Sequence, residues 1–230
     1  MNERKYCYRY PHPAVTTDCV IFGYDGSHLK VLLIERAQEP YKGKWAFPGG
    51  FVNIDESCED GAARELEEET GMTGAYIKQL GTFSDPLRDT RERVITVAYY
   101  ALVRIQEVRA GDDAAKAQWF DIDALPPLAF DHEKIMDTAR RRLRERIYFE
   151  PIVFELLPEQ FTISQLQYLY EHFLGTSLDS RNFARKMLRH NILRRLEKTA
   201  CNAGEREAHL YIFDADCYNT LKQKGNNVEF

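Results

Sequence analysis

The feature that most constrains the fold is a glycine pair followed by an acidic segment, GGFVNIDESCEDGAARELEEETGM, at residues 49–72. Ser57 can cap a helix at its start and Gly71 can end it, so residues 57–70 are predicted to be helical. Four glutamates lie within five positions of that helix. Because like charges this close repel one another, the helix is either a solvated surface or the binding place of a positive ion.

Three of these carboxylates share one helix face. Glu65, Glu68 and Glu69 stand at i, i+3 and i+4, which places them side by side. Carboxylate oxygens gathered in this way suit a hard cation such as Mg²⁺ or Mn²⁺. The preceding pair, Gly49 and Gly50, lets the backbone come close and offer a carbonyl oxygen. The segment therefore predicts a site for metal ions that grip a diphosphate.

A salt bridge is predicted to hold the loop before this helix. Arg64 lies on a neighbouring face and can pair with Glu56 at the start of the helix. This pair would fix the loop against the helix, so its expected role is structural.

The whole stretch resembles the Nudix box: Gly, five residues, Glu, seven residues, Arg-Glu, an aliphatic residue, any residue, Glu-Glu, any residue, Gly and an aliphatic residue. Every position agrees, through Gly50, Glu56, Arg64, Glu65, Leu66, Glu68, Glu69, Gly71 and Met72. Seven fixed positions at roughly 6–7% usage each would match by chance on the order of once in 10⁸ windows. The resemblance covers about residues 10–148 and implies an α/β/α sandwich.

By this resemblance the reaction is hydrolysis of a nucleoside diphosphate linked to another group. The implied catalytic metal ligands are Glu65, Glu68 and Glu69, assisted by the Gly49 carbonyl. The implied structural residues are Gly50, Glu56 and Arg64. Bound Mg²⁺ or Mn²⁺ would neutralise the diphosphate and lower the pKa of an attacking water.

Many Nudix proteins take a further acidic residue from a late loop as base or metal ligand. Asp112 and Asp113 in AGDDAAKAQWF are the candidates, and Asp113 is the predicted catalytic residue. Similar loops often carry Glu where this chain has Lys116, so the identity of the base stays open. The alternative, that both aspartates only form a turn, stays open too.

The segment FSDPLRDTRERVITVAYYAL after the box resembles the ADP-ribose-binding branch, in which a proline recurs at the position of Pro86. Arg88, Arg91 and Arg93 could meet phosphate or ribose oxygens, because arginine suits bidentate contacts. These four residues are the predicted substrate-binding residues. A solvated, charged loop is the alternative.

The remaining pattern of the first part is that of a mixed α/β domain. Strands are predicted at residues 14–22, 29–36, 45–51, 75–83, 93–104 and 116–122, and a helix at residues 131–148. The pattern changes near residue 150, which predicts one domain at residues 1–150 and another at residues 151–230. The second domain reads as helix, short turn, basic helix and β-hairpin, the order of a winged helix.

The net charge of the chain is −5, but residues 178–200 hold seven basic residues against two acidic ones. Arg181, Arg185 and Arg189 stand at i, i+4 and i+8 and form a basic ridge on the second helix. Lys186 is on the same helix and Arg195 is in the hairpin, and all five are predicted DNA-binding residues. Such a helix would enter the major groove, and the hairpin would meet phosphates. An ordinary basic surface is the alternative.

Taken together, the two domains resemble the Nudix-related transcriptional regulators. The likeness rests on Leu156-Leu157-Pro158, Phe161-Thr162 and Arg181-Asn182-Phe183. Members include repressors of NAD metabolism that sense ADP-ribose and regulators of sugar use. The resemblance implies ADP-ribose as ligand, double-stranded operator DNA as partner and a homodimer. In several members the box is degenerate and the domain only senses its ligand; the complete box here favours hydrolysis, and a sensor without catalysis is the alternative.

The expected location is the cytoplasm, with no membrane partner. No apolar run approaches the ~20 residues that span a bilayer, and the N-terminus has no apolar signal core. The five scattered cysteines show no zinc or redox spacing, as expected in a reducing compartment.

Overall fold

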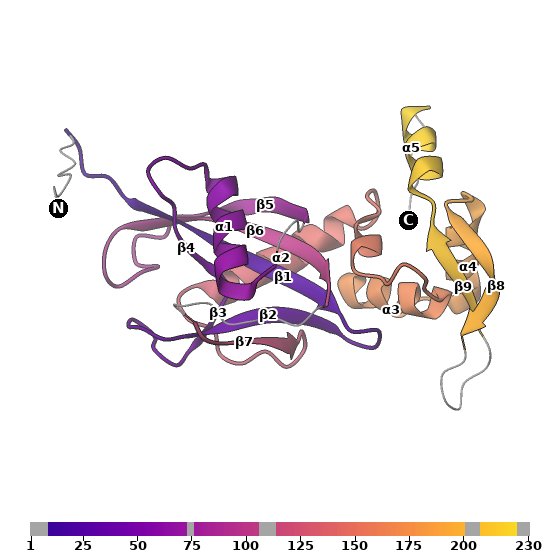
Figure 1. The fold of residues 1–230 in the computed structure, drawn as a ribbon, viewed down its shortest axis with the longest axis horizontal. Helices are drawn as coiled ribbons and strands as arrows, with labels where there is room; N and C mark the ends of the chain where they lie inside the picture. The colour runs from indigo at the N-terminus through magenta and orange to yellow at the C-terminus, as the bar shows by residue number, and fades with distance from the viewer. Residues whose placement is uncertain (1–8, 73–75, 106–113, 201–207, 225–230) are drawn as a thin grey trace.

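A seven-stranded mixed sheet carries one helix on each face and is followed by a helical unit with a two-stranded hairpin (Figure 1). The computed structural model describes residues 9–72, 76–105, 114–200 and 208–224. The first part contains β1 (Ala14–Tyr24), β2 (Leu29–Arg36), β3 (Trp45–Ala46), β4 (Gly49–Phe51), α1 (Cys58–Thr70), β5 (Tyr76–Phe83), β6 (Val94–Arg104), β7 (Ala114–Asp121) and α2 (His132–Arg146). The second part contains η1 (Ile152–Glu155), α3 (Ile163–Leu174), α4 (Ser180–Arg189), β8 (Leu193–Ala200), β9 (Ala208–Phe213) and α5 (Ala215–Gln223).

The centre of the sheet is the parallel pair β1 and β6, and the other strand pairs of the described residues are antiparallel. Strand β4 pairs with β1 as well and places Gly49 opposite Asp18. The glycine pair is thereby held against the middle of the sheet, directly before the acidic helix.

The two faces of the sheet follow from the alternation of side chains along β1. Val20 and Phe22 belong to the core that contains α2, whereas Cys19 and Ile21 belong to the core that contains α1. Strand β6 divides its side chains in the same way. Helices α1 and α2 therefore cover opposite faces, and the expected α/β/α sandwich is confirmed (Figure 1).

The second part has the expected winged-helix order of two helices and a hairpin. Thr162 and Gln165 form a capping box at the start of α3, and the Asp179 side chain caps α4. Phe183 of α4 lies with its ring 5.3 Å from that of Tyr170 of α3, which fixes the two helices together. The sequence did not predict two elements of this part. They are η1, which is too short to show a helical period, and the C-terminal helix α5.

Helix α3 also packs against the large sheet, so the two parts share one hydrophobic core. Phe173 meets Phe22 edge to face, with ring centroids 6.1 Å apart. The Tyr168 hydroxyl accepts a hydrogen bond from the Leu29 amide at 3.4 Å, and its ring lies 5.8 Å from that of Tyr24. The second domain is therefore held to the first by packed side chains as well as by the chain connection.

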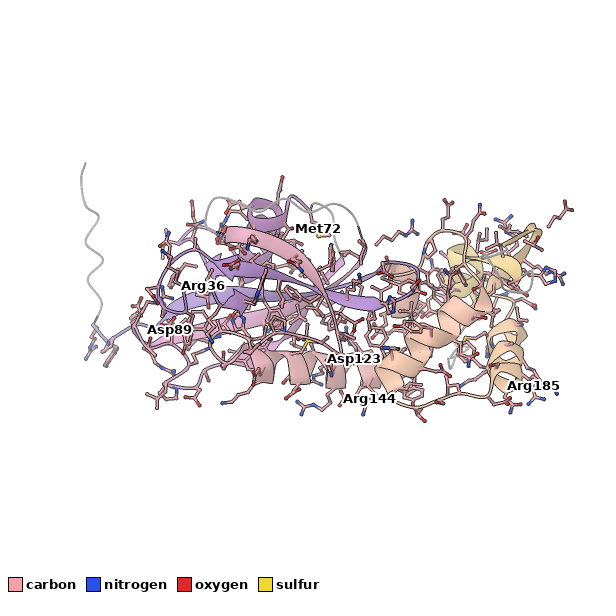
Figure 2. All side chains as sticks on the ribbon, turned by 90° about the horizontal axis from the view of Figure 1, so that it is seen from below. Arg36, Met72, Asp89, Asp123, Arg144 and Arg185 are labelled. Carbon is pink, nitrogen blue, oxygen red and sulfur yellow. The ribbon has the colours of Figure 1, made fainter. Side chains whose placement is uncertain are left out.

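Polar contacts of α2 and the strands reinforce this junction. Arg144 Nε donates to the Phe173 carbonyl at 3.1 Å, and Arg104 Nε donates to the Leu157 carbonyl at 2.9 Å. His172 Nε2 lies 3.3 Å from the Asp123 carboxylate. Figure 2 shows Arg144 and Asp123 at this junction, between the two ends of the molecule. None of the described helices is long and apolar enough to cross a membrane.

We expect Phe173→Ala to destabilise the first domain although Phe173 belongs to the second. Truncating a buried phenylalanine costs about 3–5 kcal/mol, and here the cavity opens against the sheet. Both tryptophans of the chain, Trp45 and Trp119, lie in the first domain. Urea unfolding followed by tryptophan fluorescence should therefore shift to a lower midpoint, together with the far-ultraviolet circular dichroism.

Leu188→Ala is the matched control, because Leu188 is an apolar side chain of α4 that is 37% exposed. It should change the free energy of unfolding by less than about 1 kcal/mol. An unchanged fluorescence midpoint in Phe173→Ala would show that the two cores unfold independently.

Candidate functional site

The glycine pair before α1 allows two close approaches that a side chain would block. A Cβ atom on Gly49 would collide with the Thr17 carbonyl oxygen of β1. A Cβ atom on Gly50 would collide with the Glu65 carboxylate. Gly49 therefore requires glycine, because it meets fixed backbone, whereas at Gly50 the Glu65 carboxylate would have to move. The backbone of β4 lies directly against the carboxylate side of α1.

Arg64 is the centre of the charged cluster on α1. Its guanidinium donates to both Glu56 oxygens, at 3.0 and 2.7 Å, and this bidentate pair joins the loop to the helix as predicted. The Glu56 carboxylate also accepts the Asn53 amide at 2.7 Å. The Arg64 hydrogen bonds, followed by that from Asn53, lower the pKa of Glu56 to about 2.

The same guanidinium also reaches two of the three predicted metal ligands. Arg64 Nη1 donates to Glu65 at 2.9 Å and to Glu68 at 2.8 Å. Burial raises the pKa of Glu65 against the effect of this contact. The third predicted ligand, Glu69, is buried and accepts the Gly49 amide at 2.6 Å.

A cleft of about 410 Å³ opens between α1 and the end of the sheet. One wall contains four predicted site residues, Gly49, Gly50, Glu65 and Glu69. Glu68 does not line the cleft, and its side chain is 58% exposed. Two of the three predicted metal ligands thus line one cavity, with the third exposed at the surface.

The loop between β5 and β6 also lines the cleft. Arg88 and Arg91 line the cleft, whereas Pro86 and Arg93 do not. Arg91 Nη2 is paired with Asp89 at 2.8 Å, and Arg93 Nη1 donates to the Ser84 carbonyl at 2.8 Å. Of the four predicted substrate-binding residues, two therefore reach the cavity.

Arg88 is bound by carboxylates in the floor of the cleft. It donates to Asp131 at 2.8 Å and to Asp18 at 3.3 Å, and its side chain is almost fully buried. His132 Nδ1 accepts the Phe47 amide at 3.0 Å, so its proton is on Nε2, which lies 3.4 Å from Asp18. Burial alone would raise the pKa of Asp18, but His132 and Arg88 lower it overall. These contacts give Arg88 a structural role in the cleft floor.

The acidic oxygens fit a divalent cation in kind, although they are not arranged around one. Among the described residues, no three His, Cys, Asp or Glu side chains are grouped to hold a metal ion. Two of the glutamates face Arg64, and Glu69 faces an amide. A metal ion would take oxygen ligands from Glu65 and Glu69 in the cleft wall, and Glu68 would join them by leaving Arg64.

Several residues of the cleft were not predicted from the sequence. Asp18, Arg36, Phe130 and His132 line it, and they come from the middle of β1, the end of β2, and the residues just before and at the start of α2. No short motif connects them, because the fold brings together positions that are far apart in the chain. The predicted catalytic residue Asp113 lies outside the described residues.

The predicted DNA-binding side chains of α4 all face solvent. Phe183 and Met187 are buried, while the exposed cations of the opposite side are Arg181, Arg185, Lys186 and Arg189. In the hairpin, Arg195 is exposed and contacts the His209 ring. Figure 2 shows Arg185 at the end of the molecule opposite to Arg36 and Asp89 of the cleft.

Two families match successive parts of the chain. Residues 12–142 match the NUDIX domain, and residues 153–213 match the NrtR DNA-binding winged helix domain. The chain is 34% identical over 215 residues to the ADPR responsive transcriptional repressor NtrR of Acinetobacter baylyi, which covers 91% of this chain and 86% of that protein. It is 46% identical over 127 residues to the ADP-ribose pyrophosphatase of Methanocaldococcus jannaschii, which covers 55% of this chain and 73% of that enzyme.

Two solved structures of Shewanella oneidensis NrtR are similar as well. The complex with a 27mer DNA has a TM-score of 0.76 at 32% identity and covers 89% of this chain and 95% of that chain. The NUDIX domain complexed with ADP ribose has a TM-score of 0.56 at 37% identity and covers 58% of this chain and 90% of that chain.

The fold and the site define a Nudix domain joined to a winged helix. The first is a hydrolase fold whose members generally use divalent metal ions. This chain belongs to the Nudix family and, within it, to the group that contains the NrtR proteins.

Replacing Glu56 should make stability less dependent on pH. Its pKa is about 2 in the folded protein, against ~4.3 when unfolded, so the ionised carboxylate stabilises the fold above pH ~4.3. This contribution is lost as the pH falls toward 2. The difference in free energy of unfolding between wild type and Glu56→Gln should therefore be full near neutral pH and shrink below about pH 5, as measured by urea unfolding.

Glu59→Gln is the control, because Glu59 is an exposed acidic residue in the first turn of the same helix. A difference for Glu56→Gln that varies with pH no more than that for Glu59→Gln would contradict the role of the Arg64 pair.

Proposed function

We propose that this protein is an ADP-ribose-responsive DNA-binding regulator whose Nudix domain also hydrolyses its ligand. The ligand is ADP-ribose or a related nucleoside diphosphate sugar. The observation that carries the proposal is that residues of a complete Nudix box line a cleft in the same packed body as an exposed row of cations on a winged helix. The names of the similar proteins, an ADP-ribose-responsive repressor and an ADP-ribose pyrophosphatase, support both halves.

In the hydrolytic step, Glu65 and Glu69 would hold Mg²⁺ or Mn²⁺ together with Glu68 and the Gly49 carbonyl. The ion supplies charge neutralisation for the diphosphate and a lower pKa for the attacking water. The chain's own part is to position the reactants: Arg64 and Glu56 fix the loop, and the cleft walls orient the diphosphate. Asp113 remains the proposed base.

A sensor without catalysis is the second candidate, and the contacts of Arg64 favour it. This one guanidinium binds both Glu65 and Glu68, so two ligands must be released before the metal site can form. A domain of this kind could bind ADP-ribose and change DNA affinity without turnover.

The winged helix would bind double-stranded operator DNA with α4 in the major groove. Its exposed arginines would contact phosphates and base edges, and Arg195 would contact phosphate from the hairpin. A homodimer on a palindromic operator in the cytoplasm fits this role. Because the cleft and α4 lie at opposite ends of the molecule (Figure 2), regulation requires that ligand affinity differ between the DNA-bound and free geometries.

Turnover is tested first with ADP-ribose and Mg²⁺, by following the release of AMP. The wild type should release AMP, and Glu69→Gln should lower the rate by at least about 100-fold, because loss of even an outer-shell partner of a metal costs about 10- to 100-fold. Glu67→Gln is the matched control, since Glu67 is an exposed glutamate of the same helix that does not line the cleft. A wild type that binds ADP-ribose without releasing AMP would leave the sensor as the function.

DNA binding is tested by gel shift with double-stranded DNA from upstream of the protein's own gene. Arg185→Ala should weaken binding about 10-fold and reduce the slope of affinity against salt by about one ion. Arg142→Ala, an exposed arginine of α2, removes the same charge outside the winged helix. Equal losses in the two variants would mean that the effect is one of net charge and that α4 does not read the DNA.

A further inference from the structure

One arginine that lines the cleft has donor groups with no acceptor among the described residues. Arg36 ends β2 and lines the cleft beside Phe130. Its Nε donates to the Pro40 carbonyl at 2.8 Å, which fixes the orientation of the guanidinium. Within the described part of the chain, its two terminal nitrogens have no hydrogen-bond acceptor.

An aromatic shelf holds this guanidinium in place. Arg36 lies over the Phe130 ring at 4.9 Å, and the Tyr41 ring meets Phe130 edge to face at 4.7 Å. Phe130 has φ 54° and Tyr41 has φ 66°, values that bulky residues adopt only where the surroundings enforce them. The hydrogen bond to Pro40 and the contact with the Phe130 ring therefore hold the Arg36 guanidinium in one position.

The other arginines around the cleft are neutralised by carboxylates. Arg64 binds three glutamates, Arg88 binds two aspartates, and Arg91 binds Asp89. Arg36 has no such ion pair among the described residues and is partly buried. Burial lowers the pKa of its guanidinium and the like charge of Arg91 lowers it further, while the nearby carboxylates of Asp89, Glu69 and Asp18 act in the opposite direction. Arg36 is therefore the cleft-lining arginine of the described residues whose terminal nitrogens have no directly paired carboxylate and can meet an incoming anion.

We propose that Arg36 is the anion-recognition residue of the cleft, and that its terminal nitrogens bind phosphate oxygens of the nucleoside diphosphate. This assignment rests on the proposed function, and it names the residue that recognises the diphosphate independently of the glutamates. The planar fork of arginine suits two oxygens of one phosphate group, and the Phe130 ring keeps that fork facing the cavity.

The test measures the rise in melting temperature that two probes produce in full-length protein with excess Mg²⁺. The probes are ADP-ribose and inorganic pyrophosphate, which carries the diphosphate without a nucleoside. The variants are Arg36→Gln and, to keep the charge but lose the fork, Arg36→Lys. Lys42→Gln is the matched control, because Lys42 is an exposed cation in the segment between β2 and β3 and does not line the cleft.

Arg36→Gln should lower the affinity for both probes by about 10- to 100-fold, as expected for the loss of charge-assisted hydrogen bonds. Arg36→Lys should lose less affinity than Arg36→Gln does, and Lys42→Gln should bind both probes as the wild type does. If Arg36→Gln does not fold, a loss in Arg36→Lys that affects both probes supports the assignment, and wild-type affinity overturns it.

Three other results overturn the assignment. The first is that Arg36→Gln binds both probes as tightly as the wild type does. The second is that Arg36→Gln loses affinity for ADP-ribose alone, which would place Arg36 against the nucleoside. A wild type that binds neither probe also overturns it. If the wild type binds pyrophosphate through Arg36 but not ADP-ribose, the assignment stands and the proposed ligand fails.

Discussion

The alternation of side chains along β1 decides where the rest of the molecule can pack. One set of residues receives α1 with its acidic face, and the other set receives both α2 and α3. The same strand pairs with β4 and so places the glycine pair beside the cleft. Since α3 carries α4, the recognition helix takes its position from the strand that also positions the site.

Charge compensation gives the cleft its character. Four arginines lie in or beside the cleft, on β2, on α1 and in the loop between β5 and β6, and carboxylates within the chain bind three of them. These pairs are partly or fully buried, where an unpaired charge is costly, so they fix the segments around the cleft relative to one another. Under the proposed function, a metal ion would replace Arg64 at Glu65 and Glu68, and Arg36 would contact the phosphate oxygens. A diphosphate with its metal ion combines both signs and matches this arrangement.

Local sequence signals predicted the acidic helix well, because its cap, its terminating glycine and its Arg64–Glu56 pair lie within sixteen positions of one another. The cleft floor could not be predicted in this way. Arg88 meets Asp18 and Asp131, which are 70 and 43 positions away in the chain. Arg36 and Phe130 are equally remote, and no spacing rule links them. The sequence identified the glutamates that would hold a metal ion. It could not show that Arg64 binds Glu65 and Glu68, because these contacts depend on side-chain rotamers that a sequence pattern does not specify.

The packing of α3 on the large sheet restricts how such a protein can diversify. The winged helix is not an exchangeable cassette, because a foreign helix at this position would have to fill the same space against Phe22 and Tyr24. Under the proposed function, new operator preferences would arise by substitution on the solvent side of α4, where no packed neighbour has to change at the same time. The inner side of α3 can change only together with the sheet residues that it contacts. In related proteins, substitutions on these two surfaces should therefore occur together.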